Sequence, residues 1–176
     1  MAHLADTPVL ASERLVLRAP ALKDWPGCAA FLADDRSRFV GGVLNEGRAW
    51  RMYCNVVGHW ALRGYGLFAY CEPDTDRAIG LTGPWYPADW PELEIGWTVW
   101  RKEDEGKGLA FEAATRARAW IYGTLGVPTL VSYIDPTNDR SIALAERLGA
   151  TRDDNAARPE PDDLVYRHPA PEALGR

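Results

Sequence analysis

The feature that most constrains the fold of this chain is a strand pattern followed by two glycines and a helix pattern. Residues 94–100 are rich in aromatic and β-branched side chains and predict a strand. Gly106 and Gly108 follow, and the alanine-rich residues 111–121 repeat their apolar positions close to every 3.6 residues. A glycine turn at a helix start presents free N–H groups and a positive dipole end, which together bind anions. From the glycines alone, a tight β–α turn without a ligand is an equal alternative.

Two familiar phosphate-binding loops do not fit this turn. A Walker loop requires Ser or Thr directly after its Gly-Lys pair, but Lys107 is followed by Gly108 and Leu109. The dinucleotide pattern G-x-G-x-x-G requires a third glycine where Phe111 stands. The turn therefore indicates neither a Walker nucleotide site nor a dinucleotide site.

Residues 105–110, Glu-Gly-Lys-Gly-Leu-Ala, resemble the acyl-CoA loop of the GNAT superfamily of N-acetyltransferases, whose pattern is Arg/Gln-x-x-Gly-x-Gly/Ala. Residues 130–150 resemble the strand, Asn-x-x-Ser turn and last helix of its ribosomal-protein (RimJ/RimL-like) branch. Residues 12–20 resemble the first strand of that branch. The resemblance covers residues 12–168. It implies acetyl-CoA as co-substrate and no metal.

The predicted elements describe a single α/β domain over residues 1–176. Strands are expected at residues 14–18, 65–72, 77–85, 94–100, 129–134 and 164–167, with four helices between them. The resemblance implies a mixed, mostly antiparallel central sheet flanked by these helices, with central strands that splay apart. The tail at 169–176 is expected to be mobile.

The resemblance also implies how acetyl-CoA is held. In the family, the pantetheine arm pairs with the backbone of the central strand, and the pyrophosphate rests on N–H groups of the loop. The cofactor-binding residues expected here are Trp97, Thr98, Val99, Gly106, Lys107, Gly108, Leu109, Ala110, Asn138 and Ser141. Asn138 on its own is also a plain helix cap, and both roles are compatible.

Acetyl transfer requires removal of a proton from an amine and assistance to the departing thiolate. Glu94 is the candidate base, because its spacing to Gly108 matches the general-base glutamate of the histone acetyltransferase branch. A structural Glu94 with deprotonation through water is the equal alternative, and Glu92 is the nearest other carboxylate. Ser141 and Tyr133 are the candidate acids.

Two positions depart from the family pattern. Glu105 places a carboxylate where Arg or Gln is usual, so we expect it to point to solvent, with Arg101, Lys102 and Lys107 offsetting its charge. Ala145 occupies the position where many acetyltransferases have a general-acid tyrosine. The acid must therefore be Ser141 or Tyr133, or the thiolate leaves unassisted.

Composition excludes several classes of function. The net charge is −5 and the basic residues are scattered, which disfavours a nucleic-acid partner. Three distant cysteines offer neither a disulfide framework nor a zinc pair, and His59 has no ligand-type neighbour in sequence. We find no membrane-span pattern and no export signal, so a cytoplasmic location without membrane contact is expected.

The expected function is acetyl transfer to a primary amine by direct attack. The 8 tryptophans and 7 tyrosines suggest an aromatic pocket for a small amine, whereas the resemblance favours a protein N-terminus. A homodimer stays open. The alternative is an acyl-CoA-binding or sensing module without catalysis.

Overall fold

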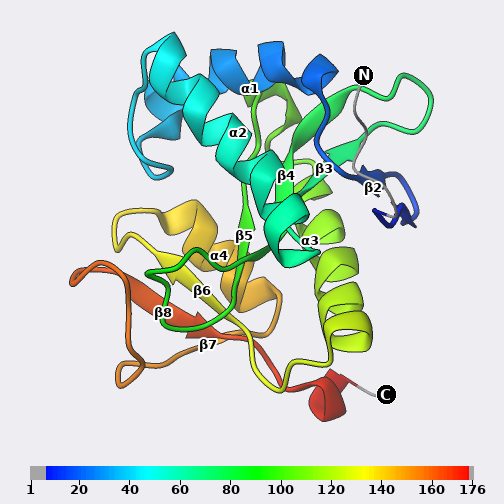
Figure 1. Ribbon diagram of the computed structural model, residues 1–176. Coiled ribbons are helices and arrows are strands. Elements are labelled where there is room, and N and C mark those ends of the chain that lie inside the picture. Colours follow the sequence, from blue (N-terminus) through cyan, green and yellow to red (C-terminus); the bar gives the residue numbers. More distant parts are fainter. Residues whose placement is uncertain (1–6, 175–176) are drawn as a thin grey trace.

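The computed structural model describes residues 7–174 (Figure 1). The strands are β1 (Leu10–Ala11), β2 (Val16–Arg18), β3 (Phe68–Cys71), β4 (Ala78–Trp85), β5 (Glu94–Trp97), β6 (Val131–Ile134), β7 (Thr151–Arg152) and β8 (Leu164–Arg167). The helices are α1 (Trp25–Leu32), α2 (Glu46–Arg63), α3 (Leu109–Trp120) and α4 (Asp139–Arg147), and a π-helical turn at Ile121–Leu125 continues α3. None of the helices in residues 7–174 is long and apolar enough to cross a membrane.

All eight strands form one sheet in the order β1-β2-β3-β4-β5-β6-β8-β7. Every neighbouring pair is antiparallel except β5 and β6, which run parallel and share one register pair, Glu94 with Val131. The predicted α/β class with a mixed, mostly antiparallel sheet is therefore confirmed. A single register pair means that β5 and β6 separate almost immediately, as the resemblance implied.

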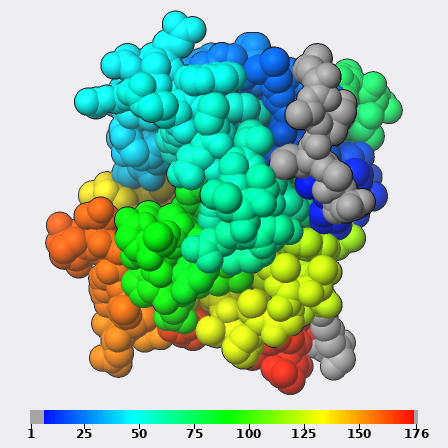
Figure 2. Space-filling view, in the orientation of Figure 1, coloured from blue at the N-terminus to red at the C-terminus, as the bar shows by residue number. Residues whose placement is uncertain are grey.

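The helices cover both faces of the sheet (Figure 1). Phe68 and Tyr70 of β3 pack in a cluster with the buried alanines of α3, whereas their neighbours Ala69 and Cys71 pack with residues of α1 and α2. This division follows from the period of two in a strand. In Figure 2, the cyan surface of α2 covers the upper part of the front face, with the green segment that leads into β5 beside its C-terminal end.

Local sequence signals explain the helix ends. Asn45 caps α2 through its side chain, which accepts from the Arg48 N–H at 3.0 Å, and Gly64 ends the helix at a φ of 74°. Asp24 precedes α1 as expected, but its carboxylate does not cap that helix; it binds Arg18 instead. The buried ion pair with Arg18 therefore takes the place of a capping hydrogen bond.

The sheet has two elements that the sequence did not indicate. β1 and β7 each contain only two residues, too few for an alternating pattern to register. At the C-terminal end, the Tyr122 hydroxyl donates to the Pro169 carbonyl and residues 171–174 form a short 3-10 helix. The last two residues of the expected mobile tail, 175 and 176, lie outside the described residues.

Candidate functional site

A cleft of about 970 Å³ opens where β5 and β6 part. Its walls come from four places: the end of β5, the glycine loop with the start of α3, the first turns of α4, and the segment between α1 and α2. Nine of the ten predicted cofactor-binding residues line it, and Lys107 does not: Trp97, Thr98, Val99, Gly106, Gly108, Leu109, Ala110, Asn138 and Ser141.

The backbone of β5 presents alternate residues to this cleft. The N–H groups of Thr98 and Trp100 donate to β4, at Leu81 and Ile79. The alternation of a strand therefore directs the main-chain groups of Trp97 and Val99 away from β4 and toward the gap. A peptide-like ligand could pair with the main chain of Trp97 and with the N–H of Val99. The Val99 carbonyl accepts from Arg36 at 2.9 Å, and the Thr98 main chain is already engaged.

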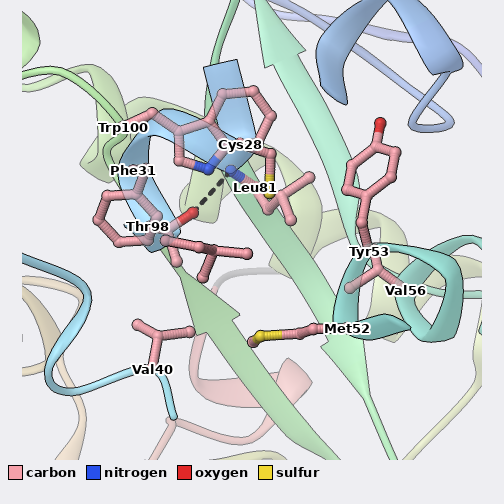
Figure 3. Close-up of a pocket in the computed structure, with 10 residues that line it drawn as sticks. Cys28, Phe31, Val40, Met52, Tyr53, Val56, Leu81, Thr98 and Trp100 are labelled. Atoms are coloured by element: carbon pink, nitrogen blue, oxygen red, sulfur yellow. Dashed lines mark hydrogen bonds between the residues drawn. The ribbon is translucent and has the colours of Figure 1, made fainter. Parts of the chain in front are cut away.

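Thr98 produces a local irregularity in β5. Its carbonyl accepts from the Tyr70 hydroxyl at 2.7 Å, while its own hydroxyl accepts from the Leu81 N–H at 3.0 Å in place of a carbonyl (Figure 3). The displaced carbonyl passes over Gly80, where a Cβ atom would lie only 1.9 Å from it. Gly80 is therefore required for this bend.

The residues around Thr98 line a small apolar cavity of about 20 Å³ between β4, α1 and α2. Figure 3 shows the side chains that line it. Cys28, Leu81 and Trp100 are among its walls. A volume of this size is about that of one water molecule. The wall behind the cleft is therefore closely packed and offers no room for a ligand group.

The glycine loop has the backbone that the sequence predicted. Gly106 and Gly108 have φ values of 72° and 75°, a region that favours glycine. Gly108 is the N-cap of α3, and its carbonyl accepts the first helical bond, from the Glu112 N–H. The N–H groups of Leu109, Ala110 and Phe111 precede that bond and are the free donors of the first turn. They lie at the cleft.

The charges at the loop differ from those expected. Glu105 does not point to solvent: it forms ion pairs with Arg36 and Arg140, neither of which the sequence had indicated. Although burial raises the pKa of Glu105, the hydrogen bond and charge of Arg36 and the charge of Arg140 bring it below its usual value. Lys107 lies 3.5 Å from Asp104, so its charge faces a buried carboxylate.

The start of α4 places Asn138 and Ser141 together. Asn138 caps the helix by accepting from the Ser141 N–H at 3.3 Å, and the Ser141 hydroxyl accepts from the Trp97 Nε1–H at 3.1 Å. The hydroxyl therefore bridges α4 and β5 across the cleft. It keeps its own proton available as a donor.

Glu94 is the first residue of β5, at the opposite end of the strand from Trp97. Its carboxylate accepts from the Trp90 Nε1–H at 2.6 Å. Burial raises the pKa of Glu94 to about 7, in spite of the Trp90 hydrogen bond, which favours the ionised form. A carboxyl group with this pKa exchanges a proton near neutrality, as a general base must.

Tyr133 and Glu92 lie beside Glu94 and not with Ser141. The Tyr133 hydroxyl accepts from the Glu92 N–H at 3.2 Å, and its ring meets Trp90 edge-on. Burial raises the pKa of Tyr133 to about 12, so it is protonated at neutral pH. Glu92 forms a bidentate ion pair with Arg167, at 2.8 and 2.9 Å. The predicted catalytic residues thus divide into two groups, Ser141 in the cleft and Glu94 with Tyr133 outside its lining.

A buried polar chain, not indicated by any motif, stands beneath the point of separation. The Ser132 hydroxyl donates to the Ile95 carbonyl at 2.7 Å and lies 3.1 Å from His168 Nε2. Arg118 donates to His168 Nδ1 and to the Leu148 carbonyl. Burial, with the nearby Arg118 charge, lowers the pKa of His168 to about 3, so the ring is neutral. Among residues 7–174, no group of three or more His, Cys, Asp or Glu is placed to hold a metal ion.

The residues at the cleft fit an acyl-CoA. Free first-turn N–H groups and the cations Arg36 and Arg140 suit a pyrophosphate. A cleft of 970 Å³ is at the upper end of the usual range for ligand pockets, which suits a long, flexible molecule.

Comparison with known proteins gives the same assignment. Residues 14–151 match the model of the acetyltransferase (GNAT) domain family. An acetyltransferase from Agrobacterium tumefaciens is 41% identical, with a TM-score of 0.87 over 92% of this chain and 94% of that one. A Bordetella pertussis protein assigned to the GnaT acetyltransferase family is 25% identical, with a TM-score of 0.76 over 92% and 99%.

At the level of fold alone, the chain is also similar to the ribosomal-protein-S5-alanine acetyltransferase of Vibrio fischeri. The identity is 13% and the TM-score is 0.65, over 92% of this chain and 94% of that one. The match to the domain family extends over most of the chain, and the family uses acetyl-CoA. This chain belongs to the GNAT acetyltransferase family and is an N-acetyltransferase.

Proposed function

We propose that the protein transfers the acetyl group of acetyl-CoA to a primary amine, with Glu94 as the general base. The observation that carries this proposal is the position of Glu94: it begins the strand whose far end lines the cleft, and its pKa is about 7. A carboxyl group with a pKa near neutrality can accept a proton at the pH of the cell. Acetyl-CoA supplies the activated acyl group.

The remaining residues have supporting roles in this proposal. The main chain of Trp97 and Val99 and the first turn of α3 bind and orient the co-substrate. The Ser141 hydroxyl, oriented by Trp97, is a proton donor on the cleft side of the reaction. Tyr133 is protonated but lies with Glu94, so it suits the acceptor side better than the departing thiol.

The acceptor is a small amine or the N-terminus of a protein. Aromatic side chains around Glu94 support an amine with an apolar body, since Trp90 meets Tyr133 edge-on and Trp85 stacks on His59 at 4.6 Å. Glu92 is held in an ion pair with Arg167, which supports Glu94 over Glu92 as the proton acceptor. The distant similarity to a ribosomal-protein acetyltransferase is the support for a protein N-terminus.

Thiol release tests the proposal directly. Acetyl-CoA is mixed with a panel of amino acids, polyamines, aminoglycosides and short peptides, and free CoA thiol is measured with wild-type protein and with Glu94→Gln. We expect turnover with at least one amine class, strongly reduced in the variant. If acetyl-CoA binds but no amine in the panel supports turnover, the alternative of an acyl-CoA-binding module without catalysis is favoured.

A further inference from the structure

The cation cluster at the glycine loop is centred on an anion. The Glu105 carboxylate accepts from Arg36 Nε and Nη2 through one oxygen and from Arg140 Nη1 through the other. The three side chains form the Arg36–Glu105–Arg140 cluster, with a net charge of +1. All three line the cleft, and Glu105 directly precedes Gly106. A carboxylate at this place repels a phosphate unless its charge is outweighed, so its function needs an explanation.

The two arginines of the cluster differ in how many N–H donors remain free to bind a ligand. Arg36 is mostly buried and donates to the carbonyls of Val99 and Trp100 at 2.9 and 2.7 Å as well as to Glu105. These four bonds use four of its five N–H groups. Arg140 is held by Glu105, while 79% of its side chain is exposed. Arg36 is therefore a fixed support and Arg140 carries the available donors.

We propose that Arg140 is a pyrophosphate-binding residue of this enzyme and that Glu105, anchored by Arg36, is the positioning residue that holds it over the loop. The proposal rests on acetyl-CoA as the co-substrate. Arg140 lies on α4 and its long side chain is exposed. If it were not held in place, it would lose considerable side-chain entropy when it bound the phosphates. A carboxylate that holds it beforehand reduces that cost, which explains a negative charge at a phosphate site.

The sign of one substitution separates this proposal from simple repulsion. Glu105→Gln removes a negative charge close to the phosphates, so repulsion alone predicts tighter binding of CoA. If Glu105 positions Arg140, the same change releases the arginine and binding becomes weaker. We expect an increase of about 10-fold in Kd for Glu105→Gln and for Arg140→Ala, the usual scale for loss of one charge-assisted bond. The double variant should bind no more weakly than Arg140→Ala.

Calorimetric titration with CoA and with 3′-dephospho-CoA measures these constants. Both ligands should be affected equally, because they share the pyrophosphate, and the salt dependence of Kd should become shallower in both variants. The kcat at saturating acetyl-CoA should stay near that of wild type while the KM rises. Arg152→Ala, on β7 and paired with Asp154, removes an exposed arginine away from the cleft and should change none of these values.

Three results would overturn the assignment: unchanged or tighter binding by Glu105→Gln, a loss limited to CoA that spares dephospho-CoA, or an unaltered salt dependence in Arg140→Ala. The second result would indicate that Arg140 binds the 3′-phosphate of CoA and not its pyrophosphate. Failure of the wild-type protein to bind CoA at all would instead refute the proposed function, so the two failures are distinguishable.

Discussion

Replacement of Glu94 by Gln preserves the shape of the side chain and removes its ability to accept a proton. General-base catalysis contributes about 10²- to 10⁴-fold, so kcat should fall by that factor. The structure also specifies the pH dependence. Because burial raises the pKa of Glu94 to about 7, its side chain is mostly protonated at pH 6 and mostly ionised at pH 8. The contribution of Glu94 to kcat/KM should therefore rise about tenfold between pH 6 and pH 8.

The ionisation of the amine substrate also changes over this range, so a single profile is ambiguous. Dividing the kcat/KM of wild type by that of Glu94→Gln at each pH cancels the effect of substrate ionisation, because both enzymes receive the same amine. The assay is continuous measurement of thiol release from pH 5.5 to pH 8.5. We expect the ratio to rise by about tenfold between pH 6 and pH 8 and then to level off. A ratio that stays constant with pH, or near one throughout, would refute the role of Glu94.

Glu92→Gln is the matched control for this experiment. The two carboxylates are two residues apart, but Glu92 is held by Arg167, and the amide can still accept one of those hydrogen bonds. We expect kcat within a few-fold of wild type and an unchanged pH limb. If the limb disappears in this variant and persists in Glu94→Gln, the base is Glu92.

Three further changes probe the residues around the site. Trp90→Phe removes the hydrogen bond that favours the ionised form of Glu94, so the acidic limb of the pH–rate profile should move to higher pH; a shift to lower pH would contradict this. Thr98→Val leaves the buried Leu81 N–H unpaired and should lower the free energy of unfolding by about 1–3 kcal/mol in denaturant titrations. Thr98→Ser keeps the hydroxyl and should retain the wild-type stability. Equal stability of the two variants would contradict the role of this hydrogen bond. Because the pKa of His168 is lowered from 6.5 to about 3, the unfolded state binds the extra proton, so the free energy of unfolding should fall as pH decreases from 6.5 toward 3; His168→Gln should flatten this slope, and an identical slope would refute the neutral buried ring.

Much of the fold could be predicted because the long elements carry strong local signals. Asn45 and Gly64 define the ends of α2, and the strand, glycine turn and helix around Gly108 are explicit in the sequence. The family pattern then supplied the sheet. The two-residue strands β1 and β7 were missed because a pairing of that length depends on the neighbouring strand and not on its own side chains.

The site was predicted in part, and the reason is again physical. The cleft residues lie on consecutive elements with a known pattern, so Trp97, Asn138 and Ser141 could be placed together from the sequence. Arg36 comes from a connection with no pattern, and its bonds to Val99 and Glu105 span more than sixty residues. Arg140 was closer to detection, since it stands two residues after Asn138 in the first turn of α4. Partners of that kind are determined by tertiary packing and have no local signal.

The single register pair between β5 and β6 also has a mechanical consequence. Apart from that pair, the Val131 N–H to Leu93 carbonyl bond and the Ser132 hydroxyl hold the two strands together near their start. The sheet therefore divides into two parts, β1–β5 and β6–β8, with few main-chain bonds between them. Changing the angle between the two parts would strain few main-chain hydrogen bonds, so we expect this junction to be the most compliant part of the sheet. A molecule that lies between the two parts and pairs with β5 should restrict their relative motion. Amide hydrogen exchange should then slow in both parts together.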